Sequence, residues 1–175
     1  MIVDGREIAE SVLAQLESER GNFGALTLGI VMSEGDRATE SFVKIKAKAA
    51  ARLNVALVRC APDEIEKALA CDGIIVQLPL PGSDALLAAL PPGKDLDALG
   101  PAPSVRAPVA EAVAEVFLRT GVDARGKTAV VVGAGRLVGA PCADLLRILG
   151  AEVSVITQTH GSLDELKNAD IVVIE

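Results

Sequence analysis

The stretch that decides the fold is Gly73-Ile74-Ile75-Val76-Gln77-Leu78-Pro79-Leu80-Pro81. An apolar run bounded by glycine and proline predicts a short strand, residues 74–77, that is buried on both faces. The prolines hold the residues before them in extended geometry and exclude a helix. Gln77 ends the strand, and ligands of open parallel sheets collect outside the carboxyl ends of the strands. Gln77 is therefore a candidate ligand contact; the alternative is an amide that caps the strand by bonding its own loop.

Strands and helices alternate on both sides of this stretch. Apolar runs predict strands over residues 25–32, 54–59, 128–132, 152–156 and 171–174. Helical periodicity predicts helices over residues 38–53, 62–70, 83–90, 109–118, 137–149 and 163–167, and a first helix that starts at a capping box of Asp4 and Glu7. This alternation is typical of right-handed βαβ crossovers. The predicted fold class is therefore α/β, with parallel sheets.

The segment 100–108 holds three prolines and little periodicity, so it is the best candidate for a domain boundary. We expect a first α/β domain over residues 1–107 and a second over residues 108–175. The second domain has the element order of a Rossmann-like unit in shortened form.

Composition narrows the classes of partner. The chain has 175 residues, half of them hydrophobic, and a net charge of −7. This acidity argues against nucleic acid as the main partner, because a phosphate backbone needs a basic face. No apolar run reaches membrane-spanning length, and the charged N-terminus is unlike a signal peptide. Cys60, Cys71 and Cys142 form no CxxC pair, so we expect free thiols in a soluble, cytoplasmic protein.

Lys46 stands out within the predicted helix 38–53. At about 100° per residue, one face of that helix carries Phe42, Ile45, Ala49 and Leu53. Lys46 falls inside this apolar face, whereas the other cationic residues of the helix lie towards the opposite side. A lysine in an apolar stripe extends its ammonium group to solvent, pairs with a partner, or loses its proton more readily than in water. A solvent-reaching lysine is therefore weighed against one that transfers protons near neutral pH.

The run Lys94-Asp95-Leu96-Asp97 follows a Pro-Pro-Gly break and is expected to form a loop. Solvated surface charge is the ordinary explanation of such a run. A carboxylate is also a natural acceptor for paired N–H groups of a heterocycle, because it offers two oxygens side by side. The loop is therefore interpreted either as surface charge or as a contact for such a ring.

Residues 130–139, Val-Val-Val-Gly-Ala-Gly-Arg-Leu-Val-Gly, predict a strand, a glycine turn and a helix that starts near Leu137. The spacing is GxGxxxG instead of the dinucleotide-binding GxGxxG. Gly133 and Gly135 still allow the backbone to approach a pyrophosphate, and a helix N-terminus offers free N–H groups. No acidic residue ends the next strand at residues 156–158, which favours NADP over NAD.

Taken in order, these segments resemble the bifunctional methylenetetrahydrofolate dehydrogenase/cyclohydrolase (FolD) family, from about Gly5 to the last residue. Four blocks carry the resemblance. Residues 42–46 are similar to the family's YVxxK, residues 73–81 to GxxVQLPLP, residues 94–98 to KDVDG, and residues 133–141 to GRSxxVGxP. Four blocks in the right order are far more specific than any one of them.

The resemblance implies roles for the residues that match. In that family the lysine of YVxxK is the catalytic acid/base, the glutamine of VQLPLP tunes it, and the second aspartate of KDVDG holds the pterin. The implied catalytic and substrate-binding residues are therefore Lys46, Gln77 and Asp97, with Phe42 in place of a stacking tyrosine. The implied cofactor-binding residues are Gly133, Gly135, Arg136 and Gly139, with NADP as cofactor, NAD as the alternative, and no metal.

The chain also departs from the family pattern. Phe42 lacks the tyrosine hydroxyl, Val109 replaces a threonine of the PCTPxG block, and Ala134-Gly135 replaces an Arg-Ser pair. Members of the family continue with further strands, whereas this sequence ends at Glu175. We expect either a missing remainder or a naturally short relative, in which the cofactor binds more weakly than folate.

The implied function is oxidation of 5,10-methylenetetrahydrofolate with NADP and hydrolysis of the methenyl product to 10-formyltetrahydrofolate, within one-carbon metabolism and purine biosynthesis. The implied partners are a folate substrate and a second copy of the chain in a homodimer. Two alternatives stay open: a non-catalytic folate- or nucleotide-binding relative, and a dehydrogenase that acts on another pterin. The presence of Lys46, Gln77 and Asp97 together opposes the first alternative.

Overall fold

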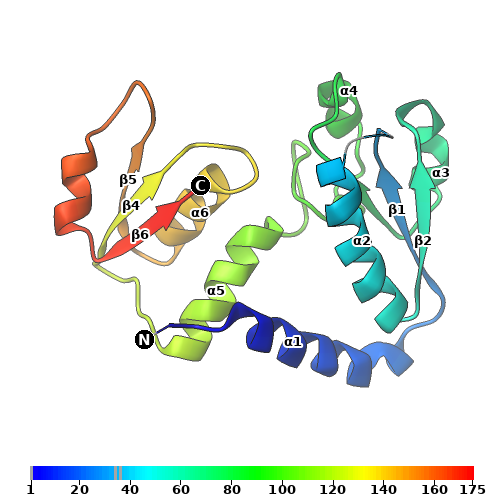
Figure 1. The fold of residues 1–175 in the computed structure, drawn as a ribbon, viewed down its shortest axis with the longest axis horizontal. Coiled ribbons are helices and arrows are strands. Elements are labelled where there is room, and N and C mark those ends of the chain that lie inside the picture. Colours follow the sequence, from blue (N-terminus) through cyan, green and yellow to red (C-terminus); the bar gives the residue numbers. More distant parts are fainter. Residues whose placement is uncertain (1, 34, 36) are drawn as a thin grey trace. The chain divides into compact units, whose positions relative to one another are not determined.

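The computed structural model describes residues 2–33, 35 and 37–175 (Figure 1). The chain divides into two compact units, Met1–Val105 and Arg106–Glu175. Each unit is built on a three-stranded sheet whose strands are all parallel. The predicted α/β class with two parallel sheets is therefore confirmed.

The first unit alternates helices and strands as the sequence predicts. Its helices are α1 (Gly5–Glu19), α2 (Arg37–Arg52), α3 (Ile65–Leu69) and α4 (Ser83–Ala88), with the short 3-10 helices η1 (Arg20–Asn22) and η2 (Pro62–Glu64). Its strands are β1 (Leu26–Val31), β2 (Val55–Cys60) and β3 (Gly73–Val76), which pair in the order β2-β1-β3. Because the strands are parallel, their carboxyl ends share one edge of the sheet, and Gln77 follows β3 at that edge.

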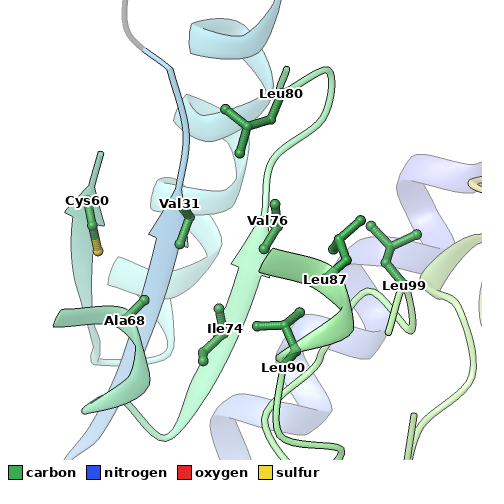
Figure 2. Packing of buried hydrophobic residues seen from close by; sticks show 9 residues of the cluster. All are labelled: Val31, Cys60, Ala68, Ile74, Val76, Leu80, Leu87, Leu90 and Leu99. Atoms are coloured by element: carbon green, nitrogen blue, oxygen red, sulfur yellow. The ribbon is translucent and has the colours of Figure 1, made fainter. Parts of the chain in front are cut away.

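Helices cover both faces of this first sheet. One face packs against α3 and α4 in the cluster that Figure 2 shows: Val31, Cys60, Ala68, Ile74, Val76, Leu80, Leu87, Leu90 and Leu99. The other face packs against α2 in a smaller cluster: Ile30, Met32, Val43 and Ile75. The neighbouring residues Ile74 and Ile75 enter opposite clusters, which confirms a strand buried on both faces. Burial of each such side chain stabilises the unit by about 1.5–3 kcal/mol.

Residues 94–96 extend the sheet beside β3 for a short distance. Ile74 N donates to Lys94 O over 2.7 Å, and Leu96 N donates to Ile74 O over 3.1 Å. Ile74 and Asp95 thus form an isolated parallel bridge. Because the pairing is parallel, the chain after Asp95 continues towards the carboxyl end of β3, where Gln77 lies.

The second unit contains α5 (Pro108–Thr120), α6 (Gly139–Ile148) and the 3-10 helix η3 (Leu163–Asn168). Its strands β4 (Thr128–Val132), β5 (Glu152–Ile156) and β6 (Ile171–Ile174) have the predicted bounds and pair in the order β5-β4-β6. The core lies between the sheet and the helices and includes Ala129, Val131, Ala143 and Leu146. The central strand β4 therefore places the glycine turn that follows it at the carboxyl edge of the sheet.

The predicted start of α6 near Leu137 is wrong, because the helix begins at Gly139. Val138 has φ −128° and ψ −68°, which are not helical angles. The chain instead closes a wide turn in which Ala140 N donates to Gly135 O over 3.0 Å. The segment 163–167 also differs from the prediction, since it forms a 3-10 helix in place of an α-helix.

Two further expectations concern the cysteine thiols and membrane-spanning segments. Cys60, Cys71 and Cys142 are free and buried, as the lack of a CxxC pair predicts. Within the part of the chain that the structure describes, no helix is long and apolar enough to cross a bilayer.

Candidate active site

The side of α2 that packs against the sheet is shifted by one residue along the helix from the apolar face that the sequence indicates. Phe42 and Ile45, which belong to the apolar face that the sequence analysis identifies, are 59% and 64% exposed, so this part of that face does not pack against the sheet. The buried apolar side chains of α2 are instead Val43, which packs on the sheet, and Ala50. Lys46 lies between them at helical spacing and has an exposed side-chain fraction of 31%. The lysine therefore belongs to the inward side of α2, although its apolar neighbours are not those predicted.

The ammonium group of Lys46 points at polar partners on the sheet. Its Nζ atom donates to Gln77 Oε1 over 2.8 Å and lies 3.9 Å from Asp97 Oδ2. These three residues come from α2, the end of β3 and the loop after residue 96. The structure thus brings together all three residues that the family resemblance implies as catalytic.

Gln77 makes the bond to its own loop that one interpretation predicts, and it also holds Lys46; its contact with a ligand stays a prediction. The side chain is buried, and Nε2 donates to Leu78 O over 2.9 Å, which is the predicted bond to its own loop. The other end of the amide, Oε1, accepts the hydrogen bond from Lys46. Because an ammonium group only donates, the amide oxygen has to face the lysine, and the bond to Leu78 fixes that orientation.

Asp97 is a carboxylate in a partly dry environment. Its side chain is 16% exposed. Burial raises the pKa of Asp97 above its usual value, the positive charge of Lys46 acts in the opposite direction, and the negative charge of Asp95 adds to the increase. Asp97 is therefore an acceptor that takes up a proton more readily than a solvated aspartate does.

The interpretation of residues 94–97 as solvated surface charge is wrong for most of the run. Asp95 is 2% exposed, and its Oδ2 accepts a hydrogen bond from Gly100 N over 2.7 Å. Lys94 Nζ donates to Leu69 O at the end of α3 over 2.7 Å. Two of the charged groups thus tie the loop to the fold, and Asp97 is left facing the lysine.

The glycine turn of the second unit follows β4 and brings backbone atoms of three glycines close together. Gly133 has φ +107°, a conformation that a residue with a side chain rarely adopts. A Cβ atom on Gly139 would overlap the carbonyl of Gly133, so only glycine lets α6 start this close to the turn. Gly135 N donates to Glu175 Oε2 over 2.7 Å. The amide of Gly135 thus points to the open side of the turn and donates to a carboxylate there.

Glu175 is a residue of this site that the sequence analysis missed. It follows β6, which pairs with β4 in parallel, so the ends of both strands meet at one edge. The sequence did offer a signal for Glu175, because this residue directly follows an apolar run that predicts a strand of the same sheet as the strand before the glycine turn. Arg136, proposed as a phosphate contact, is exposed on the same turn. Among the described residues no cluster of His, Cys, Asp or Glu has the geometry to hold a metal ion.

Comparison with known proteins identifies the family. Residues 107–175 match the family model "Tetrahydrofolate dehydrogenase/cyclohydrolase, NAD(P)-binding domain". The whole chain is similar to the bifunctional protein FolD of Lactococcus lactis subsp. cremoris, with 30% identity over 99% of this chain and 71% of that protein. The FolD protein of Neisseria gonorrhoeae is also 30% identical, over 99% of this chain and 72% of its own length.

Solved structures give the same result. The methylenetetrahydrofolate dehydrogenase-cyclohydrolase of Trypanosoma brucei, complexed with NADP cofactor and an inhibitor, is 29% identical and superposes with a TM-score of 0.87 over 100% of this chain and 71% of that chain. The Campylobacter jejuni FolD enzyme shares the fold, with a TM-score of 0.89 at 24% identity over 98% of this chain and 72% of that chain. The four sequence blocks, the geometry of Lys46, Gln77 and Asp97, and these similarities agree: the chain belongs to the bifunctional methylenetetrahydrofolate dehydrogenase/cyclohydrolase (FolD) family.

Proposed function

We propose that this chain oxidises 5,10-methylenetetrahydrofolate to 5,10-methenyltetrahydrofolate with NADP and hydrolyses the product to 10-formyltetrahydrofolate, as part of one-carbon metabolism. The observation that carries this proposal is the hydrogen bond of 2.8 Å between Lys46 Nζ and Gln77 Oε1, with Asp97 3.9 Å from the same nitrogen. In a relative that has lost catalysis, no chemical requirement would keep the amine of Lys46, the amide of Gln77 and the carboxylate of Asp97 next to one another. The geometry therefore favours the enzyme over a binding relative.

The pterin ring is proposed to bind between Asp97 and the helix α2. The carboxylate of Asp97 has two oxygens, and the ion-pair distance to Lys46 leaves them able to accept N–H groups of a heterocycle. Phe42 precedes Lys46 by one helical turn, and its ring is exposed. An exposed ring on the same side of a helix as the lysine provides a face on which an aromatic ligand stacks. Lys46, Gln77, Asp97 and Phe42 thus form the proposed substrate site.

Lys46 is the proposed acid/base of the hydrolytic step. Water adds to the carbon that bridges the two nitrogens of the methenyl compound, and the bond from this carbon to the ring nitrogen N5 breaks. The methenyl compound is a cation, and the water gives up both of its protons as its oxygen becomes the formyl oxygen: one proton ends on N5 and the other is released to solvent, so a group that accepts a proton from the water and delivers one to N5 is required. The Nζ atom of Lys46 has three N–H positions, of which one is held by Gln77. Gln77 thus orients the amine without neutralising it.

The proposed cofactor site lies at the glycine turn of the second unit. Gly139 lets the start of α6 approach Gly133, and the backbone of Gly133 and Gly135 is covered by the carboxylate of Glu175, to which the amide of Gly135 donates. These residues fit a pyrophosphate, and Arg136 adds a guanidinium that bonds phosphate oxygens in pairs. When bound, NADP supplies the acceptor for the hydride that the folate methylene group loses. A cytoplasmic location and a homodimer complete the proposal.

Assays of both activities on the chain with one lysine changed test this function. Lys46→Met should lower the rate of methenyltetrahydrofolate hydrolysis by about 10²–10⁴-fold, because a general acid/base contributes that much. Lys44→Met is the matched control, since Lys44 lies on the same helix but is exposed. A Lys46→Met variant that hydrolyses at the normal rate, while Lys44→Met does not, would reject Lys46 as the acid/base. Failure of the unchanged chain to catalyse either step would favour the non-catalytic alternative.

A further inference from the structure

Asp95 is a buried carboxylate for which the proposed reaction has no direct use. It lies in the middle of the short pairing with β3, where the main chain of residues 94–96 is held on both sides by Ile74. The backbone of Asp95 is therefore fixed by the sheet, and its side chain is almost fully removed from solvent. Burial of a carboxylate costs folding free energy unless the group is hydrogen-bonded, so Asp95 needs a strong hydrogen-bond partner.

The partner of this carboxylate is the main chain five residues further on. Asp95 Oδ2 accepts from Gly100 N over 2.7 Å, the short distance of a charge-assisted hydrogen bond. A Cβ atom on Gly100 would lie 3.1 Å from Asp95 Oδ2 and 3.1 Å from Leu87 O. Any side chain at position 100 would therefore crowd both the carboxylate and α4. The bond closes residues 95–100 into a loop that begins on the sheet and ends against α4.

Asp97 is held inside this closed loop. Ala98, the next residue, has φ +55°, so the chain turns sharply immediately after Asp97. Among the described residues, the side chain of Asp97 has no polar partner besides Lys46, whereas the bond from Gly100 to Asp95 spans the turn. The 3.9 Å separation between Asp97 and Lys46 therefore depends on where the closed loop places Asp97.

We infer that Asp95 is a positioning residue of the acid/base site: its buried carboxylate closes the loop 95–100 and thereby holds Asp97 against Lys46. The inference rests on the proposed function, because it assigns Asp95 a role through Asp97. Asp95 also acts on Asp97 through its charge. The groups that face Asp97 are Lys46 from α2 and Asp95 from its own loop, and the negative charge of Asp95 helps to raise the pKa of Asp97.

Two substitutions separate the hydrogen bond from the charge. Asp95→Asn keeps an oxygen for Gly100 N and removes the charge, so the pKa of Asp97 should fall. The acid limb of the pH profile of hydrolysis should then move to lower pH, because Asp97 has to be ionised to accept N–H groups from the pterin. Asp95→Ala also removes the acceptor, so Asp97 is displaced and kcat/KM should fall at least tenfold, as displacements of about 1 Å in active sites do.

Gly100→Ala perturbs the same bond from the other side and should reproduce the loss seen in Asp95→Ala. Because both variants break one interaction, the double variant should lose little more activity than the worse single variant. Asp72→Ala is the matched control. Asp72 also holds main chain, through Thr27 N at 2.8 Å, but at the opposite end of the strands. Asp72→Ala should lower the melting temperature and leave the pH profile unchanged.

Circular dichroism on each variant shows that the first unit is folded before activities are compared. A wild-type acid limb and wild-type KM in folded Asp95→Asn and Asp95→Ala, with only a lower melting temperature, would overturn the inference and leave Asp95 a structural residue. Lys46→Met in the same assay separates the two proposals. If the unchanged chain does not hydrolyse methenyltetrahydrofolate, the proposed function fails; if the unchanged chain hydrolyses it and Lys46→Met abolishes hydrolysis while the Asp95 variants are unaffected, only the positioning role fails.

Discussion

The Nζ atom of Lys46 lies 3.9 Å from Oδ2 of Asp97, which pairs their charges without a direct hydrogen bond. Hydrogen bonds between ammonium and carboxylate groups are shorter, about 2.7–2.9 Å. The hydrogen bond of the ammonium group goes instead to Gln77. Both oxygens of Asp97 therefore stay available for a ligand, while the lysine keeps N–H positions for proton transfer.

Removal of the Asp97 carboxylate should weaken folate binding. Asp97→Ala leaves the ligand's ring N–H groups unpaired in a partly buried site, which costs about 1–3 kcal/mol in binding free energy. Isothermal titration calorimetry with a folate analogue measures this difference. Asp144→Ala, which changes an exposed carboxylate of the second unit, is the control and should bind normally. Equal affinities for both variants would show that Asp97 makes no contact with the pterin.

Phe42 should contribute to the same affinity through its ring. Phe42→Ala is expected to lose about 0.5–1.5 kcal/mol, the range of an aromatic stacking contact. Ile45→Ala is a close control, because Ile45 lies on the same helix and is exposed to a similar degree. Both side chains are exposed, so neither change should alter stability by more than about 0.5 kcal/mol. Equal losses of affinity for the two variants would argue against a stacked ring.

The raised pKa of Asp97 predicts a pH dependence of stability. The folded state disfavours the ionised carboxylate, so the favourable effect of this group is fully present below its unfolded pKa of about 3.9 and is lost as the pH rises through the folded pKa. Asp97→Asn cannot ionise and should therefore be more stable than the unchanged chain at neutral pH. Urea unfolding at a series of pH values measures the difference, which should shrink towards pH 4. A variant that is less stable at neutral pH would mean that Lys46 outweighs burial.

Glu175 should compete with the cofactor at the glycine turn. Its carboxylate accepts the hydrogen bond of Gly135 N, the amide proposed for the pyrophosphate. Glu175→Ala frees this donor, so NADP should bind more tightly by about 1 kcal/mol, the value of one hydrogen bond. Fluorescence titration with NADPH measures the affinity, and Glu152→Ala at the opposite end of the sheet is the control. Weaker binding in Glu175→Ala would instead make Glu175 a ligand of the cofactor.

The strands could be predicted because their signals are local. The bounds of β4, β5 and β6 agree with the prediction, since each is an apolar run that ends in a charged residue, a glycine or a polar segment. The side of α2 that packs inward could not be predicted as well. Phe42 and Ile45 are as apolar as Val43, and only contact with Ile30 and Ile75 on the sheet selects Val43. The start of α6 depends on how closely Gly139 approaches Gly133, which is a contact across a turn and not a propensity.

The sequence by itself determined the α/β alternation, the buried strand before Gln77 and, through four motif blocks, the identity of Lys46, Gln77 and Asp97 as candidates. Tertiary structure alone decided how these residues act on one another. Lys46 and Gln77 are separated by 31 positions in the chain, and their bond exists because α2 packs on the sheet beside the end of β3. The same holds for Asp95 and Glu175, whose burial and partners depend on which backbone amides the fold brings to them. Hydrogen bonds and desolvation act over a few ångströms, and a one-dimensional sequence does not contain those distances.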